Sequence, residues 1–266
     1  MKIALLTGTA YRHKYYANEI IANYDVVLHI KEKREQDLTG EVKDPCSEED
    51  KILLKKHSDL RNQMEEKYFL PQGKDFLPVK KTMEVGRREL NSPEVIAAVK
   101  EAAPDVVLDY GTCLLKDDLL KVMPKHVINL HAGLSPYYKG AATLYWPIYF
   151  MEPQNLGYTM HIIDIQIDHG TILHQNKPEI FSNDNIHDLG CRTIVQAAKD
   201  IHKVLEKIQN GTIQYFKQKS KGKIFYGYDF KPYHLRVTNF IMENGLLKEY
   251  LEHKERFPEA EIFRQF

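Results

Sequence analysis

The segment "HVINLHAGLSPYYKGAATLYW" (126–146) contains residues whose types and spacing could do chemistry. Its apolar run carries Asn129 and His131 two positions apart, and residues two apart on a strand point to the same face. One pocket would then receive an amide that can stabilise a developing oxyanion and an imidazole that can act as an acid or a base. Taken alone, the two residues fit equally well a structural histidine beside a turn-forming asparagine.

A third polar residue, Asp168, stands before a glycine turn in "IQIDHGTI". A carboxylate at this place could orient His131 and tune its protonation. Asn129, His131 and Asp168 would then supply an oxyanion donor, an acid/base group and its orienter. An Asp-His-Gly segment is more often only a turn, and sequence spacing does not bring the three residues together.

The elements that must position these residues alternate between strands and helices. Short apolar runs typical of buried parallel strands occupy 2–8, 25–32, 105–111 and 126–131. Helices are predicted for 16–24, for 47–70 with Ser47 as N-cap, for 92–103 with Ser92 as N-cap and Pro93 in the first position, for 117–124 and for 185–211. This alternation predicts an α/β fold with a Rossmann-like, doubly wound, mainly parallel sheet. Ligands of such sheets bind outside the carboxyl ends of the strands, which is where Asn129 and His131 stand.

The pattern changes towards the C-terminus. The segment "GYTMHIIDIQIDHGTILHQNKPEI" (157–180) contains two β-type runs around a glycine turn and predicts two neighbouring strands. The segment "TIQYFKQKSKGKIFYGYDF" (212–230) predicts a hairpin, and a helical tail follows it. Within that tail, "FIMENGLLKEYL" (240–251) is compatible with an interface helix and hence with a homodimer.

Composition narrows the class of protein. The 266 residues include 37 basic and 37 acidic ones, and a net charge of zero argues against a dedicated nucleic-acid binder. The three cysteines, at positions 46, 113 and 191, lie far apart, which favours a reducing cytoplasmic compartment over a disulfide framework. No apolar run approaches the roughly 20 residues that a membrane span needs. We therefore expect a cytoplasmic protein that does not cross a membrane.

The stretch "NLHAGLSPYYKGAA" resembles the signature of the formyltetrahydrofolate-dependent formyltransferases. That family includes methionyl-tRNA, glycinamide ribonucleotide and sugar N-formyltransferases. Its pattern is Asn-x-His, then Ser-Leu-Leu-Pro-x-x-[Arg/Lys]-Gly, and later an Asp in a segment that "TMHIIDIQIDHGTI" matches with Asp168. The resemblance covers roughly 90–210. Two departures are Gly133-Leu134-Ser135 in place of Ser-Leu-Leu, and Lys139 in place of the commoner Arg.

This resemblance implies transfer of a formyl group from the co-substrate N10-formyltetrahydrofolate to a primary amine, without a metal. It implies that Asn129, His131 and Asp168 are the catalytic residues. It also implies that the strand and loop around "LDYGTCLL" (108–115) accommodate the pterin, with Tyr110, Gly111, Leu114, Leu115 and Asp164 as the cofactor-binding residues. We expect the formyltransferase catalytic domain over 1–210 and a C-terminal extension, a hairpin and a helix, over 211–266.

Features outside the signature favour a nucleotide-linked amino sugar as the acceptor. The first loop carries Arg12, His13 and Lys14 at a strand-to-helix turn, where backbone N–H groups and the helix dipole favour anions such as a nucleotide diphosphate. A solvated basic turn explains the same residues equally well. Lys139 and Tyr137 are further candidates for substrate contacts. The first loop, "GLSPYYKG" and the "GKIFYGYDFKP" tail are together most similar to sugar N-formyltransferases, which make N-formylated sugars for O-antigens in lipopolysaccharide and for other surface glycans.

The sequence lacks the motifs of several other activities and leaves some alternatives open. A serine hydrolase needs Gly-x-Ser-x-Gly, whereas Ser135 lies in Gly-Leu-Ser-Pro-Tyr. A dinucleotide oxidoreductase needs three spaced glycines after the first strand, and only Gly8 is present. About 55 residues follow the long helix, which we expect to be too few for the C-terminal β-barrel of methionyl-tRNA formyltransferases. Glycinamide ribonucleotide or methionyl-tRNA as the acceptor, a formyltetrahydrofolate hydrolase and a non-catalytic folate binder remain as alternatives.

Overall fold

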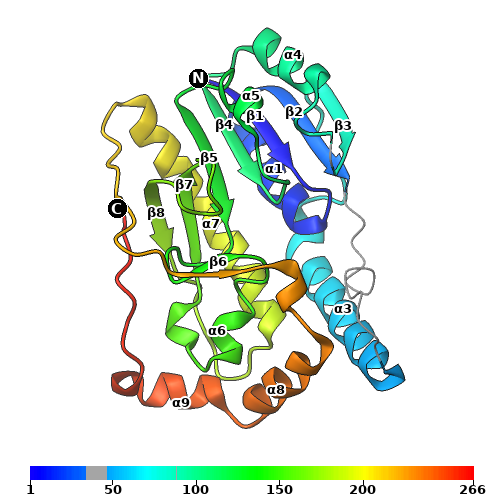
Figure 1. Cartoon of the computed structure of the whole chain (residues 1–266), viewed down its shortest axis with the longest axis vertical. Helices are drawn as coiled ribbons and strands as arrows, with labels where there is room; N and C mark the ends of the chain where they lie inside the picture. Colours follow the sequence, from blue (N-terminus) through cyan, green and yellow to red (C-terminus); the bar gives the residue numbers. More distant parts are fainter. Residues whose placement is uncertain (34–46, 88) are drawn as a thin grey trace.

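The computed structural model describes residues 1–33, 47–87 and 89–266 and is organised around one seven-stranded sheet (Figure 1). The strand order is β3-β2-β1-β4-β5-β7-β8. The strands of this sheet are β1 (Lys2–Thr7), β2 (Asp25–Lys33), β3 (Thr82–Gly86), β4 (Val106–Tyr110), β5 (His126–His131), β7 (Tyr158–Ile162) and β8 (Ile172–Asn176), and β6 (Tyr138–Gly140) pairs with β9 (Lys223–Phe225) in a second, two-stranded sheet.

The helices cover both faces of the sheet and one end of the molecule (Figure 1). They are α1 (Tyr11–Asn23), α3 (Glu48–Phe69), α4 (Pro93–Ala102), α5 (Asp117–Leu120), α6 (Trp146–Tyr149), α7 (Ile186–Gln209), α8 (Pro232–Glu243) and α9 (Leu246–Glu252). Short 3₁₀ turns lie at Leu70–Gln72, Pro153–Asn155, Gly227–Asp229 and Lys254–Arg256. No helix among the described residues is both long and apolar enough to cross a membrane.

The sheet confirms the prediction of a mainly parallel, doubly wound fold. β3, β2, β1, β4 and β5 are all parallel. β7 and β8, the two neighbouring strands predicted within 157–180, extend the sheet in antiparallel fashion. The pairing of β4 with β5 places Asp109 beside Asn129, and that of β5 with β7 places His131 beside Thr159. The polar residues of several strands therefore meet at one edge of the sheet.

Alternation along the buried strands divides the core into two layers. In β1, Ile3 and Leu5 pack with residues of α1 and α7, such as Ile201. Ala4 and Leu6 point the other way and pack with residues of α4 and α5. Because both faces of the parallel strands are covered, these strands read as continuous apolar runs in the sequence.

The predicted helix starts are confirmed at two serines. Ser47 Oγ accepts a hydrogen bond from the backbone N–H of Asp50, 3.1 Å away, at the start of α3. Ser92 Oγ accepts one from Val95 N–H at 3.4 Å, and Pro93 occupies the first position of α4. Each side chain satisfies one backbone donor that the helix itself leaves without a partner.

The C-terminal segment corrects one prediction. Residues 212–230, all of which the structure describes, do not form the expected hairpin. Phe216 instead forms an antiparallel bridge with Ile172 at the edge of the main sheet, and Lys223–Phe225 pairs with Tyr138–Gly140. Both partners lie far away in the sequence, so local turn signals do not report them. The segment is thereby tied to the loop that follows β5.

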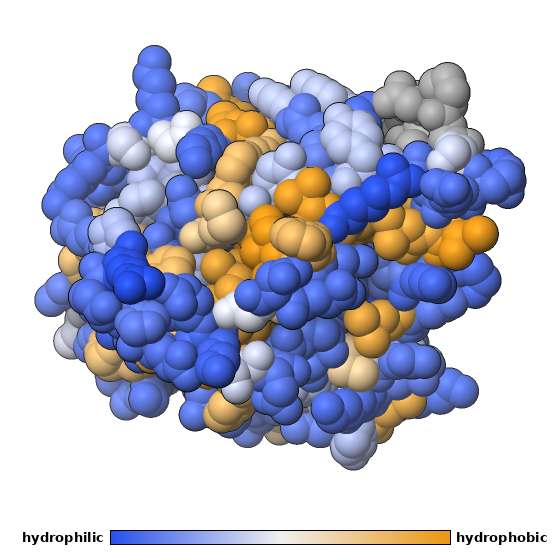
Figure 2. Space-filling model, turned by 90° about the horizontal axis from the view of Figure 1, so that it is seen from below, coloured by the Kyte–Doolittle hydropathy of each residue, from blue (hydrophilic) through white to orange (hydrophobic). Residues whose placement is uncertain are grey.

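The helical tail packs partly on its own chain. Leu246, Leu247 and Tyr250 are buried, whereas Val237 and Phe240 of α8 are 42% and 66% exposed. Figure 2 shows the face that carries α8 and α9, with hydrophobic groups gathered among hydrophilic ones. The part of the predicted interface helix that lies in α9 therefore packs against the core of this chain. The homodimer stays a prediction.

Burial governs the chemistry of Cys191. This residue is a free thiol, and the cysteine at position 46 lies outside the described residues. Burial raises the pKa of the Cys191 thiol, with a further contribution from nearby Glu65. Cys191 is therefore held in its neutral form and behaves as a small apolar side chain of α7.

Candidate active site

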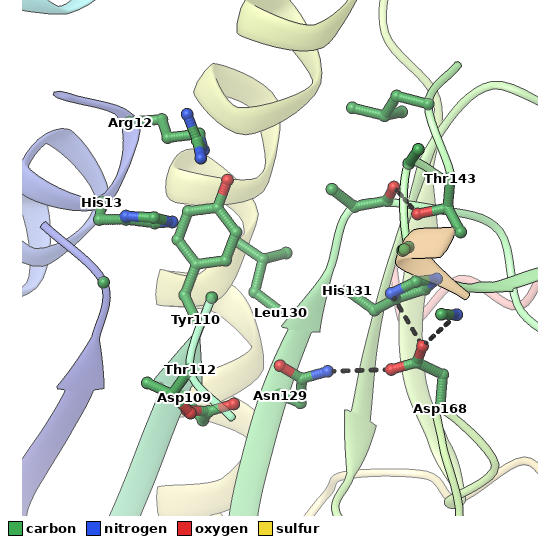
Figure 3. Close-up of a pocket in the computed structure, with 18 of the residues that line it drawn as sticks. Arg12, His13, Asp109, Tyr110, Thr112, Asn129, Leu130, His131, Thr143 and Asp168 are labelled. Carbon is green, nitrogen blue, oxygen red and sulfur yellow. Dashed lines mark hydrogen bonds and ion pairs between the residues drawn. The ribbon is translucent and has the colours of Figure 1, made fainter. Parts of the chain in front are cut away.

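A cavity of about 1140 Å³ opens at the carboxyl ends of β1, β4 and β5. This is the edge where ligands of open parallel sheets bind. Figure 3 shows Arg12 and His13 on one side, Tyr110 with its hydroxyl turned towards Arg12, and the polar cluster of Asn129, His131 and Asp168 across from them. The cavity thus brings the first loop and the β5 cluster to a common space.

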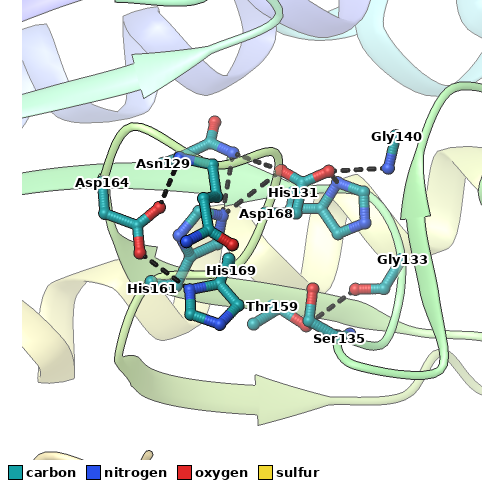
Figure 4. A network of polar contacts seen from close by, with 12 residues as sticks. Asn129, His131, Gly133, Ser135, Gly140, Thr159, His161, Asp164, Asp168 and His169 are labelled. Atoms are coloured by element: carbon teal, nitrogen blue, oxygen red, sulfur yellow. Dashed lines mark hydrogen bonds and ion pairs between the residues drawn. The ribbon is translucent and has the colours of Figure 1, made fainter. Parts of the chain in front are cut away.

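The structure brings Asn129, His131 and Asp168 together (Figure 4). Asn129 Nδ2 donates to Asp168 Oδ1 at 3.3 Å and to His161 Nε2 at 3.1 Å. His131 Nδ1 lies 3.3 Å from Asp168 Oδ2. Asp168 comes from the turn between β7 and β8, so only the antiparallel addition of these strands to β5 creates the cluster.

Asp168 is held from several sides. Its backbone is left-handed, with φ of +46°, a conformation that Asp adopts more readily than most non-glycine residues. Gln218 Nε2 of the C-terminal segment donates to its carbonyl oxygen at 2.7 Å, and the N–H of Gly140 donates to Oδ2 at 2.7 Å. Burial alone would raise the pKa of Asp168, but its interactions with His131 and His161 and the hydrogen bond from the Gly140 N–H outweigh burial and hold that pKa below its usual range. The carboxylate is therefore ionised.

The backbone at position 140 requires a glycine. It has a φ of +89°, and a Cβ built on it would lie 2.1 Å from the carbonyl oxygen of Phe225. Only glycine permits so close an approach between β6 and β9. The β6–β9 pairing in turn places the Gly140 N–H against Asp168.

The surroundings of His131 define its tautomer. Its Nε2 lies 2.9 Å from the carbonyl oxygen of Tyr138, which can only accept, so Nε2 carries a hydrogen. Burial lowers the pKa of His131, although Asp168 and the Tyr138 carbonyl partly oppose this shift. The resting ring is therefore neutral, with the Nδ1 lone pair directed at Asp168. A proton taken up at Nδ1 would create an ion pair with that carboxylate.

His161 is a member of the cluster that residue-by-residue reasoning did not single out. Its Nε2 lies 3.4 Å from Asp168 Oδ1, and its Nδ1 lies 2.9 Å from the carbonyl oxygen of Ile162. The signal was present, because His161 is the histidine of the "TMHIIDIQIDHGTI" segment. Thr159 of the same segment donates to Gly133 O at 2.7 Å and accepts from Ser135 N–H at 2.9 Å. These two bonds hold the loop whose residues depart from the family pattern.

The predicted cofactor residues all line the cavity; they are Tyr110, Gly111, Leu114, Leu115 and Asp164. Leu114 is 61% exposed, which is unusual for a leucine and provides an apolar surface for a flat ring. Asp164 accepts from the backbone N–H of Gln166 at 2.8 Å and lies 3.0 Å from His169 Nδ1. The loops 111–116 and 163–168 thus form one wall of the cavity.

The predicted basic cluster is divided by the fold. Arg12 lines the cavity and forms an ion pair with Glu65 of α3. His13 also lines it, and its Nδ1 accepts from the backbone N–H of Ala10 at 3.1 Å, so it caps its own helix. Lys14 points elsewhere: its Nζ donates to the carbonyl oxygen of Lys74 at 3.0 Å and borders a separate, smaller hollow.

The other two predicted substrate residues also lie outside the lining of the cavity. Tyr137 donates from its hydroxyl to the carbonyl oxygen of Glu261 at 3.2 Å and so fastens the C-terminal tail. Lys139 is 2% exposed, and burial lowers its pKa against the opposing influence of Asp168 and Asp164. Its positive charge acts on the cluster by lowering the pKa of His131.

Sequence reasoning missed an entire wall of the cavity. This wall consists of His57, Arg61 and Glu65 of α3, Ile186 and His187 of α7, and Phe225, Tyr226 and Phe230 of the C-terminal segment. Burial lowers the pKa of His57 to about 4 and that of His187 to about 3, so both rings are neutral. The spacing of four between the α3 residues was the available signal, because it places them on one helix face.

Among the residues that the structure describes, no group of three or more His, Cys, Asp and Glu side chains is arranged to hold a metal ion. His131 and His161 contact the carboxylate of Asp168, and His13 accepts from the backbone N–H of Ala10. His57 and His187 lie with ring centroids 4.4 Å apart.

An open α/β sheet with its cavity at the strand carboxyl ends defines the Rossmann-like class of ligand-binding fold. The family model described as Formyl transferase matches residues 26–205, and the chain belongs to this family. The match spans β2 to the greater part of α7 and therefore contains the β5 cluster.

Individual relatives agree with this assignment. The methionyl-tRNA formyltransferase of Geobacter metallireducens is 33% identical over 134 residues, which are 49% of this chain and 42% of that protein. The chain thus matches less than half the length of that curated relative. Two solved structures share the fold. A sugar N-formyltransferase from Shewanella has a TM-score of 0.58 at 14% identity and covers 91% of this chain and 87% of its own. An N-formyltransferase from Helicobacter canadensis, in complex with folinic acid and dTDP-3-aminofucose, has a TM-score of 0.56 at 19% identity and covers 91% and 81%.

Proposed function

We propose that this protein transfers a formyl group from N10-formyltetrahydrofolate to the primary amine of a nucleotide-linked amino sugar, for the biosynthesis of N-formylated surface glycans. The observation that carries the proposal is the cluster of Asn129, His131 and Asp168 at the end of β5 inside a cavity of about 1140 Å³. Such a volume can accommodate two small molecules side by side.

The first step places charge on an oxygen next to Asn129. The amine nitrogen attacks the formyl carbon, a carbon–nitrogen bond forms, and the carbonyl electrons move to oxygen. The 3.3 Å contact between Asn129 Nδ2 and Asp168 is long, so an approaching oxyanion can replace it at little cost. A donor of this kind contributes about 3–4 kcal/mol to the transition state in other enzymes.

The second step moves a proton. The attacking nitrogen becomes positively charged, and His131 Nδ1 together with Asp168 Oδ2 forms the proton-accepting unit. Asp168 is ionised and His131 is neutral at rest, so this unit has capacity for one proton. When the tetrahedral intermediate collapses, the bond to N10 breaks, the proton goes to N10, and the products are a formamide and tetrahydrofolate.

The folate is proposed to lie against the loops 111–116 and 163–168. Leu114 and Leu115 offer apolar contacts to the pterin, and Asp164 offers an acceptor for its amino group. Tyr110 lies deeper, with burial raising the pKa of its hydroxyl, so it remains a donor at every physiological pH. The folate supplies the activated formyl group, and the residues of this chain position it.

Two observations favour an amino sugar over the alternative acceptors. The Helicobacter protein of the same fold is described with folinic acid and a dTDP-linked amino sugar. The C-terminal segment 223–230 of this chain pairs with β6 and lines the cavity, so it is available to contact an acceptor bound there. The relatives found by sequence are described as methionyl-tRNA formyltransferases, and methionyl-tRNA is therefore the acceptor that the test must exclude.

The test is incubation of the protein with N10-formyltetrahydrofolate and a panel of acceptors, followed by mass spectrometry. The panel contains UDP-, dTDP-, GDP- and CMP-linked amino sugars, glycinamide ribonucleotide and methionyl-tRNA. We expect one amino sugar to gain a formyl group. Formylation of only glycinamide ribonucleotide or methionyl-tRNA would overturn the acceptor, and release of formate without any acceptor would identify a hydrolase.

A further inference from the structure

Helix α3 presents to the cavity a polar face that is separate from the β5 cluster and from the loops 111–116 and 163–168. His57, Arg61 and Glu65 follow one another at intervals of four residues, which places them on one side of the helix. All three line the cavity, whereas neighbouring cations of α3 such as Lys56 are exposed. The helix therefore contributes one cationic side chain, one carboxylate and one imidazole to the site.

The charges on this wall do not cancel. Glu65 is buried and forms an ion pair with Arg12, so these two are matched. His57 and His187 are neutral because burial holds their pKa values at about 4 and about 3. Arg61 keeps its charge; burial and the nearby Arg12 lower its pKa, and Glu65 partly opposes this shift. The wall thus carries one net positive charge.

Arg61 has little to satisfy its guanidinium. In the described part of the chain it forms no ion pair, and its hydrogen bond goes to Ser58 Oγ at 3.4 Å. Five N–H donors in a planar fork are suited to two oxygens of a phosphate or carboxylate. A partly buried arginine that forms no direct ion pair gains from a ligand that supplies an anion.

We propose that Arg61 binds the diphosphate of the acceptor, with the α3 face as the wall of a nucleoside-diphosphate subsite. This inference rests on the proposed function, since it names the part of the acceptor that α3 recognises. Arg12 lies on the same wall, where its ion pair with Glu65 holds the side chain in place. The diphosphate would thus be held at the α3 side of the cavity.

Aromatic side chains that line the same cavity favour a nucleoside over a bare phosphate. Phe230 lies 6.3 Å from the ring of His57, one turn before Arg61 on α3. Tyr226 lines the cavity, is 43% exposed and stacks on Tyr228 with centroids 5.2 Å apart. An exposed ring supported from behind is a platform on which a base can stack, and such contacts are worth about 1–3 kcal/mol per base.

The experiment is a calorimetric titration of UDP, dTDP and inorganic pyrophosphate into four proteins. These are the wild type, Arg61→Gln, Arg61→Lys and the matched control Lys56→Gln on the exposed side of the same helix. A charge-assisted hydrogen bond contributes about 1.5–3 kcal/mol, so we expect Arg61→Gln to weaken nucleoside-diphosphate binding by about 10- to 100-fold. Arg61→Lys should lose less, and Lys56→Gln should bind like the wild type. Thermal unfolding of each variant shows whether its fold is intact.

Steady-state kinetics separate this inference from its rivals. We expect Arg61→Gln to raise the KM for the acceptor and to leave the KM for formyl-folate unchanged. A rise in only the KM for formyl-folate would show that Arg61 binds the glutamate tail of the folate and would overturn the inference. Unchanged diphosphate affinity in Arg61→Gln, or no diphosphate binding by the wild type, would overturn it as well.

Failure of the proposed function has a different signature. If the wild type formylates only glycinamide ribonucleotide, the amino-sugar acceptor is wrong. An Arg61-dependent KM for that phosphorylated acceptor would then still support a phosphate contact at α3. If Arg61→Gln leaves that KM unchanged, the phosphate contact is wrong too.

Discussion

Two polar regions face each other across the cavity, and they differ in how their charges are satisfied. At the end of β5, the carboxylate of Asp168 is surrounded by Asn129, His131, His161 and the Gly140 N–H. On α3, Arg61 has only the hydroxyl of Ser58 as a hydrogen-bond partner among the described residues. The chain itself supplies the polar partners of Asp168, whereas among the described residues it supplies Arg61 with one hydrogen-bond partner.

This difference separates two tasks. A cluster whose groups are held by their own chain needs little reorganisation when charge develops, which is the arrangement that lowers a reaction barrier. A cation that lacks a counter-charge gains most when an anionic ligand arrives, which is the arrangement that gives affinity. We therefore expect substitutions in the β5 cluster to change kcat, and substitutions on α3 to change KM.

The largest effect is expected for Asp168→Asn. The amide is nearly isosteric but neutral, so it removes the charge that orients His131 and stabilises its protonated form. We expect kcat to fall by about 10²- to 10⁴-fold, the usual contribution of a positioned acid/base group. Stopped assays with formyl-folate and the identified acceptor measure this loss. The exposed Asp118→Asn is the control, and a kcat within a few-fold of the wild type in Asp168→Asn would remove the centre of the mechanism.

A smaller loss is expected for Gly133→Ala, which disturbs the same cluster by volume instead of charge. A Cβ at Gly133 would lie 2.6 Å from His131 Nε2 and 2.6 Å from Thr143 Cβ, so one of them must move. Overpacking of this kind costs about 1–3 kcal/mol of stability. We expect lower kcat and a lower unfolding temperature.

The matched control for this substitution is Gly190→Ala in α7. There the nearest atom, Leu144 Cδ1, would lie 3.8 Å from the new Cβ, an ordinary contact. Alanine is the better helix former by about 1 kcal/mol, so Gly190→Ala should raise the free energy of unfolding. Equal destabilisation by both substitutions would contradict the clash at His131.

Much of the β5 region follows from local patterns in the sequence. The apolar runs of the parallel strands are buried on both faces, and Ser92 with Pro93 starts α4 as predicted. Asn129 and His131 share a face because a strand has a period of two. Their meeting with Asp168 came from the resemblance of the motif, since the antiparallel β7–β8 pair that delivers Asp168 depends on long-range strand pairing.

The α3 region could be predicted as a helix but not as a wall of the site. Ser47 and the apolar spacing define the helix, yet what a helix face meets is decided by packing far away in the sequence. The same limit explains the missing hairpin, because the partners of Phe216 and Lys223–Phe225 lie 44 or more residues away. It also explains Lys14, which the turn of α1 directs away from Arg12.

The next effect in size concerns pH and is confined to the α3 wall. Burial lowers the pKa of His57 to about 4 and of His187 to about 3, so both bind protons more tightly in the unfolded chain, near their ordinary value of about 6.5. Their contribution to stability is complete above pH 6.5 and is lost as pH falls from there through about 4. The double variant His57→Gln, His187→Gln should therefore lose less of its unfolding temperature between pH 7 and pH 4.5 than the wild type.

Thermal unfolding over this pH range measures the difference, with His253→Gln, a half-buried histidine outside the cavity lining, as control. A steep loss that persists unchanged in the double variant would assign the acid sensitivity to other groups. His29, whose pKa burial also lowers to about 3, is the first of these. His29 lies on β2, away from α3, so its replacement would show whether the acid sensitivity arises in the sheet or in the α3 wall.

The smallest effect is expected for Ser47→Ala, at the start of α3. Loss of an N-cap typically costs about 1 kcal/mol. The first turns of α3 are exposed apart from Leu54, and Asp50 is tied to the body by its ion pair with Arg236. We therefore expect faster hydrogen exchange over the first turns of α3 and no change at β5.

Ser92→Ala is the counterpart at α4, whose Val95 and Val99 are buried in the core, so its cost should appear in global unfolding. If Ser47→Ala instead speeds exchange at β5, the two sides of the cavity unfold as one unit, and the separation between a fixed catalytic edge and an adaptable binding wall is wrong.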